Sequence, residues 1–283
     1  MNTLKCEVIA QDWDKALIMP LLQNSLPNFK VPEKDNVTLL GAPLTAEATK
    51  RSLATKYNDL ERMIKRLRDI EPPAAFFLLK NFLWVPKLLY LLRSSPLFKD
   101  APGALKRIDN LLREGLSSTI NVDFNCTNWN QAIIPVSTGG LGFCRTADLA
   151  LPAYLSSTHS TAALIKDILP PNFHCNLECR IVGAVEAWKS ANPDTDLPDI
   201  LDRHVQKEWD RATYTRQYNN ILSASSQVDR ARFLAAASKS SGAWLEAIPS
   251  AHFGTLLDGE SIRIGAALRV GAKVCEPRPC RCG

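Results

Sequence analysis

The sequence predicts a mainly α-helical protein with a small β-hairpin element near its N-terminus. Apolar residues recur at three- and four-residue steps through most of the 283-residue chain, as on one face of a helix. Strand-like runs are confined to the first 44 residues, in KCEVIA and NVTLLGAPL. With 46% apolar and 22% charged residues, the chain is long enough to bury at least one full core. We therefore expect a globular protein with a helical bundle followed by a second helical region.

The first long helix is expected to begin at Thr45, whose hydroxyl can cap its N-terminus, and it contains neither proline nor glycine before Pro72. One face carries an apolar stripe, made of Leu53, Tyr57, Leu60, Ile64 and Leu67. The opposite face is basic, with Arg51, Arg62, Lys65 and Arg66. This amphipathic helix is the best candidate for contact with nucleic acid phosphates. From charge spacing alone, a solvated helix surface without a partner is the favoured interpretation.

The next helix is predicted over 74–92, in a stretch about as long and apolar as a membrane span. Lys80, Asn81, Pro86 and Lys87 lie at its middle. Because each charge at mid-bilayer costs roughly 2.5 to 3.5 kcal/mol, we expect a buried helix rather than a membrane segment. Pro86 is expected to kink it, because proline removes a backbone hydrogen bond and clashes with the preceding turn.

The rest of the chain is expected to alternate between helices and loops. A third helix should start near Pro102 and carry an apolar stripe, made of Leu105, Ile108, Leu111, Leu112 and Leu116. The Asn- and Gly-rich segment 121–143 predicts an extended loop with short strands. Further helices are predicted over 145–157, 159–168, 177–190, 198–222, 227–246 and 258–269. The predicted parts are a β element (1–44), a helical bundle with the following loop (45–140), a C-terminal helical region (141–270) and a Cys-rich tail (271–283).

Composition and motifs narrow the function classes. The net charge of +5 permits a polyanionic partner without requiring one. The chain contains no Gly-rich phosphate loop, no His-Glu-x-x-His, no Gly-x-Ser-x-Gly and no adjacent pair of aspartates, so we expect no catalytic activity from it alone. Eight cysteines are too sparse for a disulfide framework, and the first residues lack the apolar core of a signal peptide. An intracellular location, cytoplasmic or nuclear, is therefore expected.

Three cysteines near the C-terminus, Cys275, Cys280 and Cys282, form the better candidate metal site. A structural zinc site takes four Cys or His ligands from two clusters, and only one cluster is present, so an incomplete zinc site is predicted. His174, Cys175 and Cys179 form a second group. Small buried cysteines are the favoured interpretation there, because no fourth ligand stands at zinc spacing.

The order of several segments resembles the C-terminal part of reverse transcriptases from LINE-like non-LTR retrotransposons, from the end of the palm through the thumb and the helical region that follows. The segments, which extend from Leu4 to Gly283, are LKCEVI, LLGAPL, the basic helix, PKLLYLLR, WNQAIIPVSTGGLGF, LALPAYLSS, SGAWLEAIPS, GTLLDGESIRIGAALRVGA and CEPRPCRCG. None of these motifs is highly specific, but their number and order are.

The resemblance implies roles for particular residues. Lys5 matches a family lysine near the incoming nucleotide, and Gly41 lies in a segment similar to the primer grip. The basic helix would contact an RNA/DNA template-primer, and the terminal cysteines would be the first half of a Cys/His element. The family's catalytic aspartates lie upstream of the position of Met1, so the chain is expected to be a polymerase fragment. Mg²⁺ would then belong only to the full-length parent enzyme, whose palm domain would be the missing partner.

Other interpretations stay open. The segment containing Gly41 can be an ordinary turn, and Lys5 a lysine at a strand edge. The helical body can also be a protein-interaction module retained by a host, or a part of an enzyme whose palm is supplied separately. Most tryptophans are expected in the core, with Trp129 as the one candidate for stacking on an unpaired base.

Overall fold

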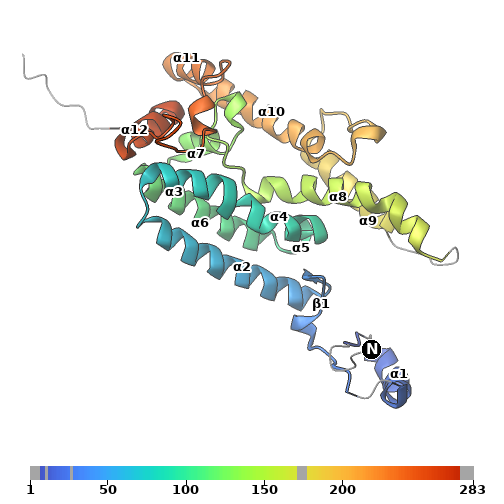
Figure 1. Ribbon diagram of the computed structural model, residues 1–283. Coiled ribbons are helices and arrows are strands. Elements are labelled where there is room, and N and C mark those ends of the chain that lie inside the picture. The colour runs from blue at the N-terminus through green and yellow to red at the C-terminus, as the bar shows by residue number, and fades with distance from the viewer. Residues whose placement is uncertain (1–6, 10–11, 26–27, 171–176, 275–283) are drawn as a thin grey trace, which may run out of the picture. The chain divides into compact units, whose positions relative to one another are not determined.

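A computed structural model describes residues 7–9, 12–25, 28–170 and 177–274. The protein is mainly helical with one two-stranded hairpin near the N-terminus, so the predicted fold class is confirmed (Figure 1). The chain divides into two compact units, Met1–Thr55 and Lys56–Gly283, which are described separately.

The N-terminal unit contains helix α1 (Asp12–Ser25), the 3₁₀ turn η2 (Lys34–Asn36) and strands β1 (Thr38–Leu39) and β2 (Ala42–Pro43). The strands pair antiparallel through a two-residue turn, Leu40-Gly41, in which both residues have positive φ (51° and 82°). Such turns match the twist of a hairpin, and glycine adopts this conformation without strain. Helix α1 was not predicted, because its apolar residues form a run around Pro20 rather than a stripe.

Helix α2 (Ala46–Leu67) begins directly after Thr45, as predicted, and it buries the predicted apolar face. The backbone N–H of Ala48 donates to the Thr45 hydroxyl at 3.1 Å, which is the expected cap. Among the stripe residues, Leu53, Leu60, Ile64 and Leu67 are buried, and Tyr57 is partly buried. The helix crosses the division between the two units, which falls after Thr55.

The predicted kinked helix over 74–92 is instead two helices, α3 (Pro72–Leu78) and α4 (Val85–Ser94), joined by a π-helical turn, η3 (Leu79–Leu83). The chain breaks at Trp84, whose backbone is not helical (φ −97°, ψ −98°). Pro86 therefore stands in the first turn of α4, where its missing N–H costs nothing.

Among the described residues, Pro72–Ser94 is the one helical stretch that could cross a membrane by length and composition alone, a test that core helices also pass. Many of its large apolar side chains are buried in this unit, in agreement with the expected core helix: Phe76, Leu79, Trp84, Leu88, Leu91 and Leu92.

Two further helices, α5 (Leu97–Asp100) and α6 (Pro102–Ile120), follow. Helix α6 starts at the predicted proline and buries its predicted stripe, Leu105, Ile108, Leu111, Leu112 and Leu116. The predicted extended loop over 121–143 was wrong in part. It contains helix α7 (Cys126–Ala132) and the 3₁₀ turn η4 (Val136–Thr138), and these residues form no strand. Asn125 and Asn128 form a reciprocal capping box that starts α7.

The remaining helices are α8 (Thr146–Ile168), α9 (Leu177–Ala191), α10 (Gln206–Ala224), α11 (Gln227–Ala236) and α12 (Gly259–Val270). Helix α8 is continuous where two helices were predicted, and it contains Pro152. Helices α10 and α11 are shorter than the predicted 198–222 and 227–246, because 3₁₀ turns over Ile200–Asp202 (η5) and Ala243–Leu245 (η6) occupy part of those ranges.

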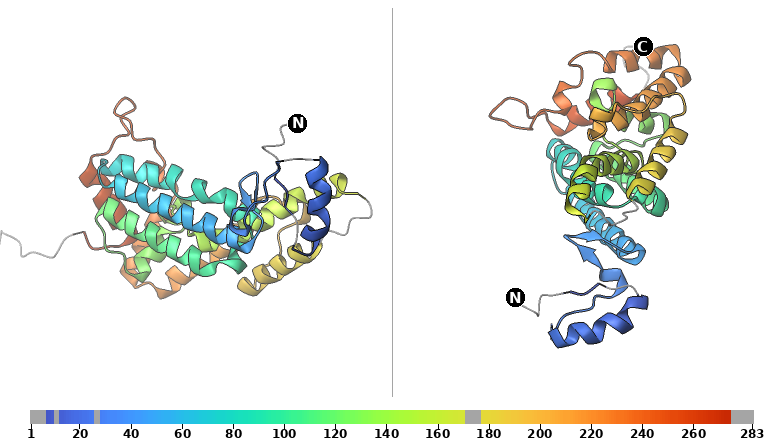
Figure 2. Two further views of the ribbon diagram at one scale, coloured as in Figure 1. Left: turned by 90° about the horizontal axis from the view of Figure 1, so that it is seen from below. Right: turned by 90° about the vertical axis from the view of Figure 1, so that its right-hand side faces the viewer.

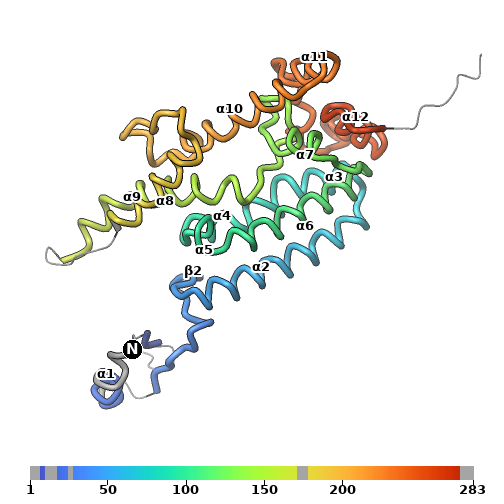
Figure 3. Tube along the Cα trace, turned by 180° about the vertical axis from the view of Figure 1, so that it is seen from behind, coloured from blue at the N-terminus to red at the C-terminus, as the bar shows by residue number. Residues whose placement is uncertain are grey.

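Helix α8 is central to the second unit, where it packs against α4, α6, α9 and α10 (Figures 1 and 3). A cluster around Trp188 and Trp209, whose rings meet edge to face at 5.3 Å, fills the space between α8, α9 and α10. Helix α12 packs against α3, α6, α7 and α11 (Figure 2). The predicted division at residue 140 falls inside this packed unit.

A carboxylate from α6 caps the N-terminus of α8. Asp109 accepts hydrogen bonds from the backbone N–H and the hydroxyl of Thr146, both at 2.7 Å, and from the N–H of Ala147 at 3.1 Å. Arg145, the residue at the N-cap position, provides no side-chain cap. Burial raises the pKa of Asp109, and the bonds from Thr146 and Ala147 oppose that shift.

A buried polar network joins the segment around α7 to α12. Gln131 donates to the carbonyls of Gly139 at 2.9 Å and Arg269 at 2.8 Å, and it accepts from the Arg232 guanidinium at 2.9 Å. Arg269 itself donates to the carbonyls of Gly140 at 2.9 Å and Val136 at 2.8 Å. Two motifs more than a hundred residues apart in the sequence are thereby held together.

Candidate nucleic-acid interface

The structure separates the predicted site residues. Gly41 and Arg51 belong to the N-terminal unit, whereas Arg62, Lys65 and Arg66 belong to the second unit. Several other predicted residues lie outside the described part of the chain: Lys5, His174, Cys175, Cys275, Cys280 and Cys282. The described residues contain no group of three or more His, Cys, Asp or Glu side chains that could hold a metal ion.

In the N-terminal unit, Gly41 occupies the exposed hairpin turn between β1 and β2. Arg51 forms an ion pair with Asp35 at 2.7 Å, and both side chains are largely exposed. The turn conformation accounts for the glycine without any ligand. A role in gripping a primer therefore stays a prediction.

The basic face of α2 is exposed, but carboxylates lie among its cations. Arg62 pairs with Asp59 at 2.6 Å, and Lys65 pairs with Glu61 at 3.2 Å. Arg66 forms no ion pair within the described residues. Exposed pairs of this kind are weak, at about 0.2 to 1 kcal/mol, so a phosphate could compete for these cations. The face is nevertheless less positive than its arginines and lysine alone suggest.

Helix α6 adds a second set of cations that sequence reasoning missed. Lys106 and Arg107 are exposed and Arg113 is partly exposed, on the side of α6 away from its buried stripe. None of the three forms an ion pair within the described chain. Their signal was present in the sequence as basic residues one, six and seven positions apart, between the apolar positions of the helix.

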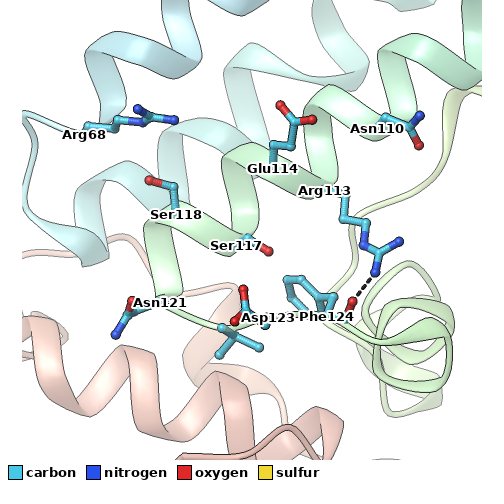
Figure 4. A pocket seen from close by; sticks show the side chains of 10 residues that line it. Arg68, Asn110, Arg113, Glu114, Ser117, Ser118, Asn121, Asp123 and Phe124 are labelled. Atoms are coloured by element: carbon cyan, nitrogen blue, oxygen red, sulfur yellow. Dashed lines mark hydrogen bonds between the residues drawn. The ribbon is translucent and has the colours of Figure 1, made fainter.

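A groove of about 780 Å³ lies between the end of α2 and α6, closed on one side by the loop after α6 (Figure 4). Arg68 lies across from the α6 side chains, among which Arg113 adds a second guanidinium. Hydroxyls and amides supply most of the remaining polar lining: Ser117, Ser118, Asn110 and Asn121. Two carboxylates, Glu114 and Asp123, also line it.

Local sequence explains the shape of this groove. Gly115 lets α2 approach α6 closely, because a Cβ there would lie 3.1 Å from the Ile64 side chain. Helix α6 ends at Asn121, which adopts the left-handed conformation (φ 51°) favoured by asparagine at helix ends. The next residues turn inward, since Val122 and Phe124 are buried.

Arg113 is held at one wall of the groove. Its guanidinium donates to the carbonyl of Phe124 (Figure 4) and lies 6.0 Å from the centre of the Trp129 ring. Arg68 makes no hydrogen bond or ion pair through its side chain within the described residues. One arginine of the groove is thus fixed and the other is open.

Trp129 was predicted as the one tryptophan that could stack on an unpaired base, and its surroundings do not suit that role. It is 7% exposed and packs edge to face on Phe124 at 5.6 Å, so it has no open ring face for an unpaired base. Trp84, Trp188 and Trp209 are also buried, as expected, and Trp244 is partly buried. The surface around the groove therefore offers charge and hydrogen-bond donors rather than stacking platforms.

Taken together, α2, α6 and the groove can bind phosphate oxygens through guanidinium, ammonium, hydroxyl and amide donors. Guanidinium groups stay protonated and suit phosphate geometry. No protein-family model, curated protein or solved structure matches this chain.

Proposed function

We propose that this protein is the thumb-like and following helical region of a retrotransposon reverse transcriptase, and that it binds an RNA/DNA template-primer without reading its sequence. The observation that supports the proposal best is a set of cations along α2 and α6 that form no ion pair with any described residue: Arg66, Arg68, Lys106, Arg107 and Arg113. The order of the sequence motifs supports the same assignment. Because the chain has no adjacent pair of aspartates, we propose no polymerase activity for it alone.

Cations of this kind would bind the phosphate backbone of any duplex, because contacts to phosphates do not depend on the base sequence. Binding should release counter-ions and weaken steeply with salt, with a slope of about 0.9 per phosphate contact. The mixture of carboxylates with the cations limits affinity for very compact anions. Serine and asparagine donors along α6 would fix the register of one strand in the groove.

The test is fluorescence anisotropy with a labelled RNA/DNA hybrid between about 50 and 200 mM salt. Reversal of Arg66, Arg68, Lys106 and Arg107 to Glu should weaken binding by about 100-fold and reduce the salt slope by roughly three to four. The control reverses four exposed lysines and arginines outside this surface to Glu: Lys87, Lys207, Arg230 and Lys239. Equal losses in both variants would mean that net charge, and not this surface, governs binding.

Two further variants separate the two halves of the surface. Reversing Arg62, Lys65 and Arg66 tests the face predicted from sequence, whereas reversing Lys106 and Arg107 tests the face that the structure adds. We expect both to weaken binding of the hybrid. If neither changes affinity or salt slope, the proposed interface is wrong.

A protein-interaction module is the second candidate, supported by exposed apolar side chains at the far end of α8 and the turn η5: Leu164, Ile168, Ile200 and Leu201. Such a module would bind no hybrid. A full-length protein that shows no salt-dependent anisotropy change would favour this candidate over nucleic-acid binding.

A further inference from the structure

A second pocket, of about 360 Å³, lies between the C-terminal half of α8 and the turn that precedes α10. Four of its lining side chains are ionisable and all four are basic: His159, Lys166, Arg203 and His204. Two alanines of α8 and Ile200 complete the wall. A pocket lined by basic groups and no acid is suited to an anion.

The two permanently charged groups of the pocket have little competition from nearby carboxylates. Lys166 pairs with Glu178 at 3.2 Å, but both side chains are at least 70% exposed, so the pair is weak. Arg203 donates from Nε to the carbonyl of Pro198 at 3.2 Å. Its two terminal nitrogens make no hydrogen bond within the described chain and remain available to a ligand.

His159 provides an unusual group on the α8 side of this pocket. Its ring stacks on the fully buried ring of Trp209, with centroids 5.6 Å apart and planes 15° apart. Its Nε2 atom is buried and has no hydrogen-bond partner among the residues that the structure describes. Buried polar atoms are nearly always paired, so an unpaired imidazole nitrogen in a basic pocket points to a ligand.

The two walls are fixed to each other by the same tryptophan. Trp209 Nε1 donates to the carbonyl of Arg203 at 2.7 Å, while its ring supports His159. Burial, and to a smaller extent Arg203, lowers the pKa of His159, so the imidazole is neutral at pH 7. A bound anion would oppose both effects, because it would place negative charge beside the ring.

We propose that this pocket binds the phosphate group of a small phosphomonoester, through Arg203, Lys166 and His159. The guanidinium, ammonium and imidazole groups that suit a phosphate all line this one pocket. The volume is more than ten times the roughly 30 Å³ that one water occupies, so there is room for an organic group against Ala162, Ala163 and Ile200. The pocket does not share residues with the α2–α6 surface, and the proposal does not rest on nucleic-acid binding.

The histidine side chains give a direct test by NMR, since the chain has only four histidines. We would titrate the full-length protein with inorganic phosphate, with phenyl phosphate and with a short single-stranded RNA. The expected result is a saturable shift of the His159 resonances and a rise in the pKa of His159. Phenyl phosphate should bind about tenfold more tightly than inorganic phosphate, because its ring adds apolar contact.

Matched variants sharpen the test. Arg203→Gln should weaken phenyl phosphate binding by about tenfold, and it leaves the carbonyl that Trp209 requires. Lys207→Gln, an exposed charge nearby, should leave binding unchanged. The proposal fails if phosphate compounds leave His159 unshifted, if Arg203→Gln and Lys207→Gln act alike, or if only the RNA produces the shift. Far-UV circular dichroism of each variant checks the fold. A second readout is the same titration of the His159→Gln variant, with binding followed by tryptophan fluorescence.

Discussion

Arginines serve two different purposes in the second unit, and a comparison between Arg269 and Arg68 shows why. Arg269 is 8% exposed, and its donors end on the carbonyls of Gly140 and Val136 and on the hydroxyl of Ser241. Arg68 is exposed beside the groove and its side chain has no partner within the described residues. Both residues are arginines, and they differ in whether their N–H groups have acceptors within the fold. Arg269 joins parts of the fold through its hydrogen bonds, whereas Arg68 is available to a ligand.

The buried arginines also show what the exposed ones avoid. Arg269 forms no ion pair within the described part of the chain, and burial lowers its pKa. The partly buried Arg232 has one ion pair within the described residues, with Asp229 at 3.7 Å, and burial lowers its pKa as well. Peptide carbonyls hold these cations by hydrogen bonds without neutralising them. Removal of a buried charge or its partner should therefore change stability strongly, whereas removal of an exposed one should not.

Arg269→Met should have the largest effect, because in a buried site it removes the donor of the Gly140 carbonyl and one of the two donors of the Val136 carbonyl, which keeps only the N–H of Gly139. We expect a loss of about 3 to 5 kcal/mol in the free energy of unfolding, measured by urea titration. Arg68→Met is the matched control and should change stability by less than about 0.5 kcal/mol. Similar values for the two variants would remove the distinction between buried and exposed arginines.

Asp210→Asn should instead stabilise the protein at high pH. Burial raises the pKa of Asp210 from its usual 3.8 to about 7, with Asp148 adding to the shift. Between these values the folded protein holds a proton that the unfolded chain releases, so stability falls as pH rises from about 4 to 7.

The Asn variant removes this dependence and should gain up to about 4 kcal/mol at pH 8, at roughly 1.4 kcal/mol per pKa unit. Thermal and urea unfolding across this pH range would measure it. The exposed Asp199→Asn should show no such gain. A wild-type stability that is flat across the window would show that Asp210 is not a source of pH dependence.

Asp109→Ala should cost about 2 kcal/mol, because the N–H groups of Thr146 and Ala147 lose their acceptor at the start of α8. Asp123→Ala, on the exposed loop beside the groove, is the control. If urea midpoints of the two variants agree, the cap contributes nothing measurable.

Arg62→Ala should have the smallest effect, below about 0.5 kcal/mol, because its pair with Asp59 is exposed. A double-mutant cycle with Asp59→Ala measures the coupling directly. A coupling above about 1 kcal/mol would show that this exposed pair contributes as much as a buried one. It would contradict the distinction between exposed and buried charges.

The elements with strong periodicity could be predicted from sequence. Leu105, Ile108 and Leu112 fixed the face of α6, and Thr45 located the start of α2. Helix α7 was missed because its start depends on a capping box between Asn125 and Asn128, residues that equally favour loops. The helical backbone is interrupted at Trp84, two residues before Pro86, the residue from which a kink was predicted.

The candidate sites were less accessible to sequence reasoning. The groove needs Gly115 against Ile64 and Arg68 opposite Arg113, contacts that no local pattern records. The same holds for the phosphate pocket, since His159 and Arg203 stand 44 positions apart and meet only through Trp209. Periodicity indicates which face of a helix is buried, but not which side chains from other elements it will meet.

The carboxylate of Asp109 has a consequence for the order in which the fold assembles. The first turn of α8 has its cap only when α6 is already beside it, so the two helices should form as one cooperative event rather than in succession. The amide protons of Thr146 and Ala147 therefore report on docking of α6 as well as on local helix formation. In a hydrogen-exchange experiment, these two amides should lose their protection together with the amides of α6. If the two helices come apart independently, the two amides should instead lose protection at a different time from α6.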